Sequence, residues 1–228
     1  MTRRMVTFDA YATLVDFRLT EATRRILADR LPMDGVDTGE FLDNFRVMRF
    51  QAVLGPYRSY REVLRSSMEI AMRLHGIPYS PSDGEALVAA VPSFGPFPEV
   101  PGALRALKAA GYEIAIISNT DDDLISGNVA KIGVEPDHVI TAQQARAYKP
   151  SRETFDYAYR VMEIEPVLVT HVAQGWEYDL IPTRDLGLKR RVWINRYRRA
   201  GSAVYQPYDE LHDLSPLPAL LEGPLGRG

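Results

Sequence analysis

The stretch FDAYATLVD, residues 8–16, places an acid, Asp9, directly after a short apolar run near the start of the chain. Residues 5–8 are apolar and β-branched or aromatic except for Thr7, which predicts a short buried strand that stops abruptly at the acid. What Asp9 does depends on what the rest of the chain brings beside it, and therefore on the kind of sheet to which this strand belongs.

The composition is that of an ordinary globular protein. The 228 residues are 46% hydrophobic and 25% charged, enough for one large domain or two small ones. A net charge of −3 gives no whole-molecule field to attract nucleic acid or an anionic membrane, so a small-molecule partner is the better expectation. The absence of cysteine excludes a disulfide scaffold and a thiolate nucleophile. The apolar run before Asp9 is too short for a signal peptide or a membrane span, so we expect a cytoplasmic protein.

Residues 20–91 have apolar side chains at helical spacing and no strand pattern. Proline and glycine divide this segment at residue 32, at residues 55–56 and at residues 76–81, which predicts three or four helices. The segment is followed by a stiff, proline-rich connection at residues 92–101, of the kind found between domains.

Beyond residue 102, helices and strands alternate. We expect helices at residues 103–110, 121–131 and 152–162, a short helix before Gly187, and strands at residues 113–117, 138–141, 167–173 and 191–194. This alternation predicts an α/β fold with a doubly wound parallel sheet. If the first strand belongs to that sheet, residues 15–97 form an inserted helical domain, and residues 1–14 and 98–228 form the core domain. Only the tail from Ser215, rich in proline and glycine, is expected to be loosely ordered.

Polar side chains follow four of the predicted strands. In a parallel sheet these strand ends meet at one edge, where ligands bind, so the side chains form a plausible catalytic set. In chain order they are Asp9, Ser118 with Asn119, Lys149, and Gln174 with Asp179.

Four motifs in this order resemble those of the haloacid dehalogenase superfamily. They are FDAYATLVD at residues 8–16, IISNT at 116–120, YKPSRETF at 148–155 and HVAQGWEYD at 171–179. The resemblance covers the whole chain and implies a Rossmann-like core with an inserted helical cap. It is closest to the L-2-haloacid dehalogenases (type II), among which homodimers are common. Ala12 stands where glycine is common in their first motif.

Two positions separate a dehalogenase from a phosphatase of the same superfamily. The phosphatases carry a second aspartate where this chain has Tyr11, and a tyrosine of ordinary pKa near 10 is poorly matched to proton shuttling at neutral pH. Gln174 stands where they have a carboxylate that helps to hold Mg²⁺. Without a metal, a phosphate dianion would be repelled by ionised Asp9 by roughly 8 kcal/mol at about 4 Å, whereas a 2-haloacid presents a neutral carbon. We therefore expect no metal and no cofactor.

The resemblance implies a role for each site residue. Asp9 attacks the halogen-bearing carbon and forms an ester, and Asp179 activates the water that cleaves this ester. Lys149 holds Asp9 and offsets charge on the ester oxygens. The other site residues are hydrogen-bond donors to Asp9 or to the substrate carboxylate, namely Thr13, Ser118 and Asn119, and pocket residues, namely Tyr11, Gln174 and Trp176.

In similar dehalogenases an arginine on an early cap helix accepts the halide. The pair Phe45 and Arg46 resembles the aromatic-arginine pair that carries it, which identifies Arg46, with Arg49 in reserve. A second alignment, counted back from residues 55–60, puts Phe41 at this position.

Two other functions stay open, a phosphatase that uses Mg²⁺ with Asp9 and Asp179, and a binding protein that keeps the fold without activity. The three acids at residues 121–123 suit the first turn of a helix better than a cation site, because the helix dipole favours them there. The basic residues within 189–199 suit solvated strand ends better than a nucleic-acid site. The four histidines lack the spacing of zinc ligands.

Overall fold

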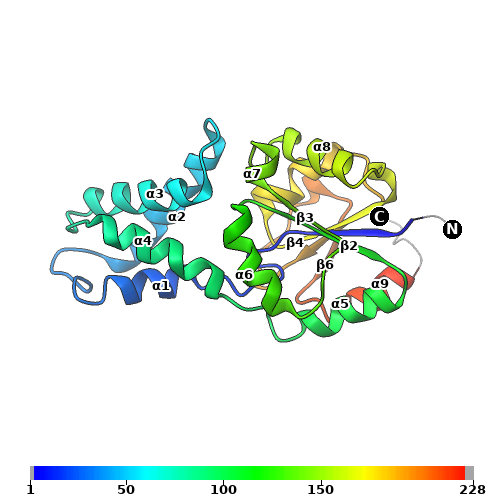
Figure 1. Ribbon diagram of the computed structural model, residues 1–228, viewed down its shortest axis with the longest axis horizontal. Coiled ribbons are helices and arrows are strands. Elements are labelled where there is room, and N and C mark those ends of the chain that lie inside the picture. The colour runs from blue at the N-terminus through cyan, green and yellow to red at the C-terminus, as the bar shows by residue number, and fades with distance from the viewer. Residues whose placement is uncertain (1–2, 224–228) are drawn as a thin grey trace.

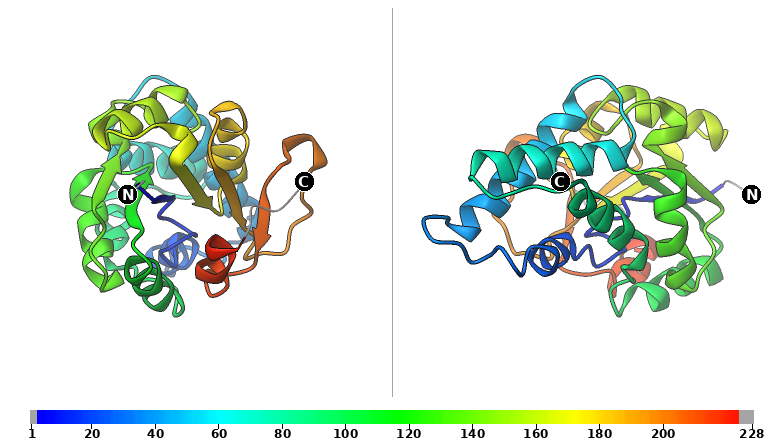
Figure 2. Two further views of the ribbon diagram at one scale, coloured as in Figure 1. Left: turned by 90° about the vertical axis from the view of Figure 1, so that its right-hand side faces the viewer. Right: turned by 60° about the vertical axis from the view of Figure 1, so that its left-hand side comes forward.

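The computed structural model describes residues 3–223 and contains a six-stranded sheet in which every neighbouring pair of strands is parallel (Figures 1 and 2). The strand order is β3-β2-β1-β4-β5-β6, so the first strand of the chain lies in the middle of the sheet. The predicted doubly wound α/β fold is confirmed. The strands are β1 (Met5–Phe8), β2 (Glu113–Ser118), β3 (His138–Thr141), β4 (Val169–Ala173), β5 (Arg190–Ile194) and β6 (Asp209–Leu211).

Helices cover both faces of this sheet, with α5 and α9 on one side and α7 and α8 on the other in Figure 1. Successive side chains of a strand point to opposite faces. On β2, Ile116 therefore joins the hydrophobic cluster that contains Leu104 of α5, whereas Ile117 joins the cluster that contains Phe155 of α8. The helices of the core are α5 (Val100–Ala109), α6 (Asp122–Ile132), α7 (Ala142–Ala145), α8 (Arg152–Val161) and α9 (Leu217–Glu222).

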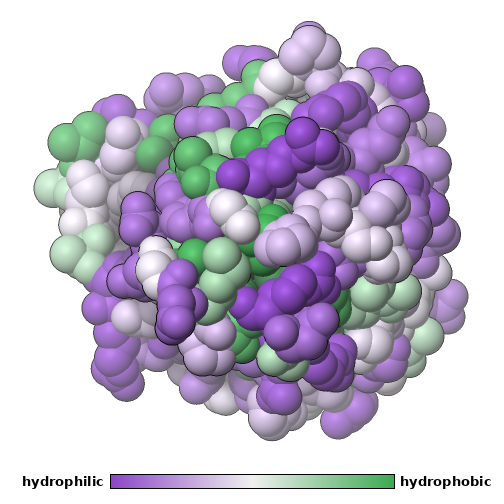
Figure 3. Space-filling model, turned by 90° about the vertical axis from the view of Figure 1, so that its left-hand side faces the viewer, coloured by the Kyte–Doolittle hydropathy of each residue, from purple (hydrophilic) through white to green (hydrophobic). Residues whose placement is uncertain are grey.

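Four helices form the insertion between β1 and β2, which lies beside the sheet at the left of Figure 1. The helix α3 begins at a capping box: Ser59 accepts from the backbone N–H of Glu62, whose carboxylate accepts from the N–H of Ser59. On the end face that the insertion presents, apolar side chains form small separate patches among polar ones (Figure 3). The helices are α1 (Leu19–Ile26), α2 (Thr38–Leu54), α3 (Tyr60–Leu74) and α4 (Pro81–Ala90).

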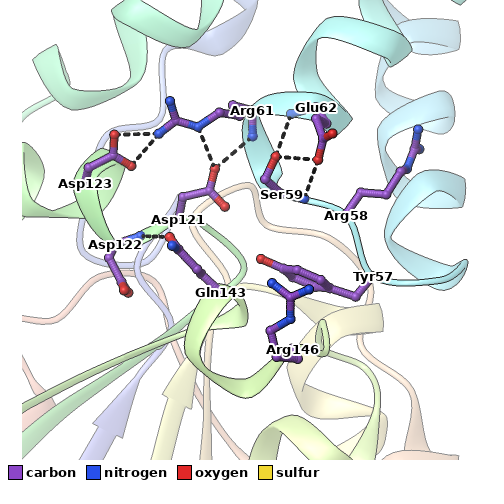
Figure 4. A pocket seen from close by; sticks show the side chains of 10 residues that line it. All are labelled: Tyr57, Arg58, Ser59, Arg61, Glu62, Asp121, Asp122, Asp123, Gln143 and Arg146. Carbon is purple, nitrogen blue, oxygen red and sulfur yellow. Dashed lines mark hydrogen bonds and ion pairs between the residues drawn. The ribbon is translucent and has the colours of Figure 1, made fainter.

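A charged cluster of Arg61, Asp121 and Asp123, here called the junction cluster, joins the insertion to the core (Figure 4). The carboxylate of Asp121 accepts from the backbone N–H groups of Tyr60 at 2.8 Å and Arg61 at 3.0 Å, so a core side chain caps the first turn of α3. Asp121 is also the N-cap residue of α6, as expected for an acid at the start of a helix, but its side chain makes no capping hydrogen bond there. Asp122 and Asp123 do lie in the first turn of α6.

The C-terminal part is more ordered than the sequence predicts. The strand β6 and the helix α9 were not predicted, and α9 contradicts the expectation of a loosely ordered tail from Ser215. The physical reason is burial, because Leu214 and Leu217 are fully buried and belong to the main hydrophobic cluster. Residues 224–228 of that tail, like residues 1–2, lie outside the described part of the chain.

The basic residues near the last predicted strand are not all solvated. Arg190 and Arg191 are only 8% and 6% exposed, so the expectation of solvated strand ends is wrong for both. The guanidinium of Arg191 donates to the backbone carbonyls of Leu180, Tyr205 and Pro207, which satisfies its buried N–H groups. Within residues 3–223, no helix has the length and apolar content needed to cross a membrane.

Candidate active site

The carboxyl ends of the central strands meet at one edge of the sheet, beside the insertion. Asp9 directly follows β1 and Ser118 ends β2, while Lys149 lies between α7 and α8, in the connection that follows β3. Asp179 lies in the short turn Trp176–Leu180 that follows β4. Side chains distant in sequence thus converge on one point, and three of them, Asp9, Lys149 and Asp179, are in direct contact.

Asp9 is held at the start of a tight turn. Its backbone N–H donates to the carbonyl of Val172, 3.1 Å away, which ties the end of β1 to β4. The hydroxyl of Thr13 donates to Asp9 Oδ2 at 2.8 Å and accepts from the N–H of Gln174 at 2.8 Å. Ala12 adopts φ 65°, a left-handed conformation that an L-residue other than glycine adopts at a cost. The turn therefore fixes the Asp9 carboxylate at the carboxyl edge of the sheet.

Lys149 bridges the two carboxylates. Its ammonium Nζ lies 2.9 Å from Asp9 Oδ1 and 2.7 Å from Asp179 Oδ1, and the side chains of Lys149 and Asp179 are each 1% exposed. The side chain of Asn119 fixes the loop, because its amide donates to the carbonyl of Lys149 and its Oδ1 accepts from the N–H of Lys149, both at 2.8 Å. Hydrogen bonds therefore hold Lys149 at both its backbone and its ammonium group.

Since two carboxylates share a single ammonium, their pKa values separate. Burial raises the pKa of Asp9 above its ordinary value, although Lys149 and Thr13 act against this rise. Burial would also raise the pKa of Asp179, but Lys149 and His171 together hold that pKa below its ordinary value. Burial alone would lower the pKa of Lys149, yet the two carboxylates hold it above its ordinary value. Lys149 and Asp179 therefore stay charged over a wide pH range, and Asp9 is the carboxylate that takes up a proton more readily.

These residues do not fit a Mg²⁺ site. Mg²⁺ requires an octahedron of oxygen ligands, and here an ammonium lies against both carboxylates that would hold the ion. Tyr11 cannot replace a carboxylate, because its hydroxyl is engaged with Thr120 Oγ1 at 3.1 Å and Asn128 Oδ1 at 3.2 Å. Within the described residues, no three His, Asp or Glu side chains are grouped so that they could hold a metal ion.

A pocket of about 270 Å³ lies over Asp9 and Lys149, between the core and the insertion. Three arginines lie on its wall, Arg46 and Arg49 from α2 and Arg199 from the loop after β5. Six further residues of the wall are aromatic, and apolar rings of this kind strengthen the electrostatic field of the charged groups. The aromatic residues are Tyr11, Phe17, Phe50, Tyr60, Trp176 and Tyr178.

The predicted pocket residues Tyr11, Gln174 and Trp176 do line this pocket. Tyr11 presents its ring, stacked on Phe17 at 4.3 Å between centroids, and turns its hydroxyl away. Trp176 packs against Trp193 with the ring centroids 4.8 Å apart, so it is both wall and core.

Asn119 lines the pocket as well, but its amide is bound to the backbone of Lys149 and not to Asp9. The hydroxyl of Ser118 is buried and has no hydrogen-bond partner among the described residues. The two candidate arginines differ in their surroundings. The side chain of Arg46 is 65% exposed, whereas Arg49 is half-buried, with its guanidinium 4.8 Å from the centroid of the Phe45 ring.

Several residues of the site were not predicted from the sequence. Phe50 and Tyr178 meet across the pocket with ring centroids 5.2 Å apart, one from the insertion and one from the core. Arg199 reaches the wall from a loop that carries no recognisable pattern. His171 and Gly175 lie inside the fourth motif, so the sequence did contain a signal for them, namely their place between β4 and Asp179.

A cavity of about 560 Å³, larger than the pocket over Asp9, lies at the junction cluster (Figure 4). Its carboxylates already have partners: Asp121 binds backbone N–H groups, Asp122 accepts from Thr141 at 2.6 Å, and Asp123 pairs with Arg61. In the smaller pocket, by contrast, Asp9 shares the buried ammonium of Lys149 with Asp179.

Comparison with known proteins agrees with this geometry. Residues 4–181 match the family described as haloacid dehalogenase-like hydrolase. The chain is 26% identical to haloacetate dehalogenase H-2 of Moraxella sp. (strain B), over 90% of this chain and 91% of that protein. It is 25% identical to (S)-2-haloacid dehalogenase 1 of Pseudomonas sp. (strain CBS-3), over 96% of each chain.

Among solved structures, an L-2-haloacid dehalogenase from Xanthobacter autotrophicus with chloropropionic acid covalently bound has the same fold. The TM-score is 0.78 and the identity 19%, and the alignment covers 97% of this chain and 99% of that one.

Proposed function

This chain belongs to the haloacid dehalogenase-like hydrolases, and we propose that it hydrolyses the carbon–halogen bond of short 2-haloalkanoic acids through an ester on Asp9, without a metal ion. The observation that carries the proposal is the buried ammonium of Lys149, within hydrogen-bond distance of both Asp9 and Asp179 beneath a pocket walled by arginines and aromatic rings. The names of the two relatives support this class of substrate.

In the first half of the reaction a carboxylate oxygen of Asp9 attacks the carbon that bears the halogen. A carbon–oxygen bond forms, the carbon–halogen bond breaks, and the halide leaves with the bonding pair, so the carbon is inverted. Halide is a good leaving group and needs no proton, which suits a pocket where Tyr11 stands in place of a second aspartate. The bonds from Lys149 and Thr13 hold the attacking carboxylate in one orientation.

In the second half a water molecule attacks the carbonyl carbon of the ester on Asp9 and releases the 2-hydroxyacid. Asp179 accepts one proton of the water and passes it to the departing oxygen, which becomes the hydroxyl of the product, and the other proton is released as the carboxylate of Asp9 is restored. Negative charge develops on the ester oxygen during this attack, and Lys149 Nζ, 2.9 Å from Asp9 Oδ1, is positioned to offset it.

The substrate carboxylate and the departing halide are both anions, and the arginines of the pocket balance them. We propose Arg46 as the halide acceptor, with Arg49 in reserve, and Ser118 as a donor to the substrate carboxylate, since its buried hydroxyl has no partner among the described residues. The matched variants Arg46→Gln and Arg49→Gln separate the two candidates. The variant that lacks the true halide acceptor should show the larger fall in the rate of halide release.

The experiment that tests the function measures chloride released from each enantiomer of 2-chloropropionate, with and without a chelator. We expect release from one enantiomer, unchanged by the chelator, and no release by Asp9→Asn. Phosphate release from phosphoesters that requires added Mg²⁺, together with no activity toward any short haloacid, would contradict the proposal.

We also propose that residues 15–97 act as a cap domain over a core of residues 1–14 and 98–228, that the protein is a homodimer, and that it works in the cytoplasm. Support for the cap comes from the pocket wall, to which α2 and the core both contribute. Light scattering after size-exclusion chromatography tests the dimer, which has twice the chain mass of 25.6 kDa.

A further inference from the structure

His171 lies in the middle of β4, directly opposite Thr7 of β1, and is 1% exposed. Its ring packs edge-on against Phe155, with centroids 5.8 Å apart and an angle of 87° between the planes. A polar ring at the centre of a parallel sheet is costly unless both nitrogens find partners. Both nitrogens do so, and one partner is Asp179 of the catalytic cluster, the name used here for Asp9, Lys149 and Asp179.

The hydrogen bonds of His171 place a donor against Asp179. Nε2 lies 3.0 Å from Asp179 Oδ1, and Nδ1 lies 2.8 Å from Thr7 Oγ1. An ionised carboxylate only accepts, so Nε2 carries a proton and donates to Asp179. Nδ1 and the hydroxyl of Thr7 form the second hydrogen bond, which holds the ring in this orientation.

The two carboxylate oxygens of Asp179 differ in their hydrogen-bond partners. Oδ1 accepts from both Lys149 Nζ and His171 Nε2, whereas Oδ2 is buried and has no hydrogen-bond partner among the described residues. Oδ2 lies beside Gly175, a residue of the pocket wall, so closely that a Cβ at that position would come within 2.4 Å of it. Asp179 is thus held with Oδ2 against Gly175, where the pocket wall has no side chain.

We infer that His171 is a positioning residue for the hydrolytic half of the reaction: it holds Asp179 so that Oδ2 takes the proton of the attacking water. The inference rests on the proposed function. As the water oxygen bonds to the ester carbon of Asp9, a proton of the water passes to Oδ2, and the bond between Asp9 Cγ and the ester oxygen breaks. The departing ester oxygen takes the proton from Oδ2 and leaves as the hydroxyl of the 2-hydroxyacid, while the second proton of the water is released and Asp9 returns to a carboxylate. His171 keeps its own proton throughout and touches no reacting atom.

Electrostatics support the same assignment. Burial acts to raise the pKa of Asp179, and the groups that lower it are Lys149 from the connection between α7 and α8 and His171 from β4. The other titratable groups coupled to Asp179 are Asp9 and Tyr159 of α8. Without His171 the pKa of Asp179 rises, and the acid limb of the hydrolytic step moves to higher pH.

The test compares His171→Phe with His75→Phe, the same change at a histidine of the insertion that binds Asn44 at 2.9 Å and lies outside the site. With 2-chloropropionate, we expect His171→Phe to release about one chloride per active site at the wild-type rate and then to turn over roughly 10- to 100-fold more slowly. Intact-protein mass spectrometry should detect the accumulated ester, and the acid limb of steady-state turnover should move to higher pH. His171→Gln, which can donate to Asp179, should recover part of the rate, and His75→Phe should behave as wild type.

If the burst and the steady-state rate of His171→Phe fall by the same factor, or if no ester accumulates, the inference is overturned while the proposed function stands. If the wild type releases no chloride from any haloacid, the proposed function itself fails. Should His171→Phe not fold, Thr7→Val removes the hydrogen bond between Thr7 and His171. Thr7→Val should also keep the wild-type burst of chloride and slow the steady-state turnover, by a smaller factor than His171→Phe. If the ratio of the burst rate to the steady-state rate in Thr7→Val equals that of the wild type, the inference is overturned.

Discussion

The catalytic cluster of Asp9, Lys149 and Asp179 and the junction cluster each contain two carboxylates and one cationic side chain. In the catalytic cluster the Lys149 side chain is 1% exposed, whereas in the junction cluster the side chains of Arg61 and Asp123 are 35% and 64% exposed. The junction cluster lines a larger cavity than the catalytic cluster does, and yet its carboxylates are bound to backbone N–H groups of α3 or to Arg61. Reactivity is thus indicated by desolvation and by an oxygen left without a partner, and not by the size of a cavity.

The largest contrast is expected when the cation of each cluster is removed. Lys149→Met leaves two buried carboxylates without their counter-charge, which should lower the free energy of unfolding by about 3–5 kcal/mol and abolish turnover. Arg61→Met removes a partly exposed partner and should lower it by no more than about 1 kcal/mol, with turnover retained. Chemical denaturation at pH 7 measures both. Equal losses in the two variants would remove the distinction between the clusters.

A second contrast concerns the backbone beside Asp179. At Gly175 a Cβ would lie 2.4 Å from Asp179 Oδ2, so Gly175→Ala must displace that carboxylate by about 1 Å, which should cost on the order of 100-fold in turnover. Gly102→Ala is the matched control, because nothing lies within 4 Å of its added methyl group. Steady-state chloride release by the two variants makes the comparison, and an active Gly175→Ala enzyme would show that Asp179 need not be held there.

The clusters should also respond differently to acid. Burial raises the pKa of Asp9 above its ordinary value of 3.8. The rate of the halide-release burst should therefore fall when the pH drops through this raised pKa, at a pH above 3.8. The hydrogen bond from Arg61 lowers the pKa of Asp123, so its contribution to stability is present above the unfolded value of about 3.9 and is lost only as the pH falls through the lower folded value. Activity should thus disappear while near-ultraviolet circular dichroism still reports a folded protein. Simultaneous loss of both signals would contradict this order.

The smallest contrast lies in the two turns. Ala12 beneath the catalytic cluster has φ 65°, and Arg146 beside the junction cavity has φ 54°. Ala12→Gly relieves the left-handed strain and should raise the free energy of unfolding by about 1 kcal/mol. Arg146→Gly relieves the same strain but also removes a cation–π contact with Tyr57 at 4.3 Å, so its gain should be smaller. Melting temperatures of the two variants test the order.

Much of the fold could be predicted from the sequence because its signals are local. The strand at residues 5–8 and the strand at residues 138–141 have the predicted limits, and the four helices of the insertion follow from apolar spacing and from breaks at proline and glycine. The strand β6 and the helix α9 were missed because their segments are rich in polar residues, proline and glycine. The strand β6 forms by pairing with β5, and α9 is held because Leu214 and Leu217 reach the core, so both depend on tertiary contacts.

The candidate site divides in the same way. Asp9, Lys149 and Asp179 could be proposed from their places after strands, since parallel strands bring their carboxyl ends to one edge. The partners of Asp121 could not, because they lie on α3, sixty residues earlier in the chain. The role of His171 also escaped the sequence, since a histidine inside a buried strand has no spacing pattern, and its meaning comes from the register that sets it opposite Thr7.

The central claim is that Asp9, paired with an ammonium in place of a divalent ion, attacks carbon. The most direct measurement quenches the enzyme during turnover of 2-chloropropionate and locates the added mass by peptide mass spectrometry, with and without a chelator. The account predicts an ester on the peptide that contains Asp9, in equal amount under both conditions. Chloride release with no adduct on that peptide, or an adduct that forms only when Mg²⁺ is supplied, would contradict it.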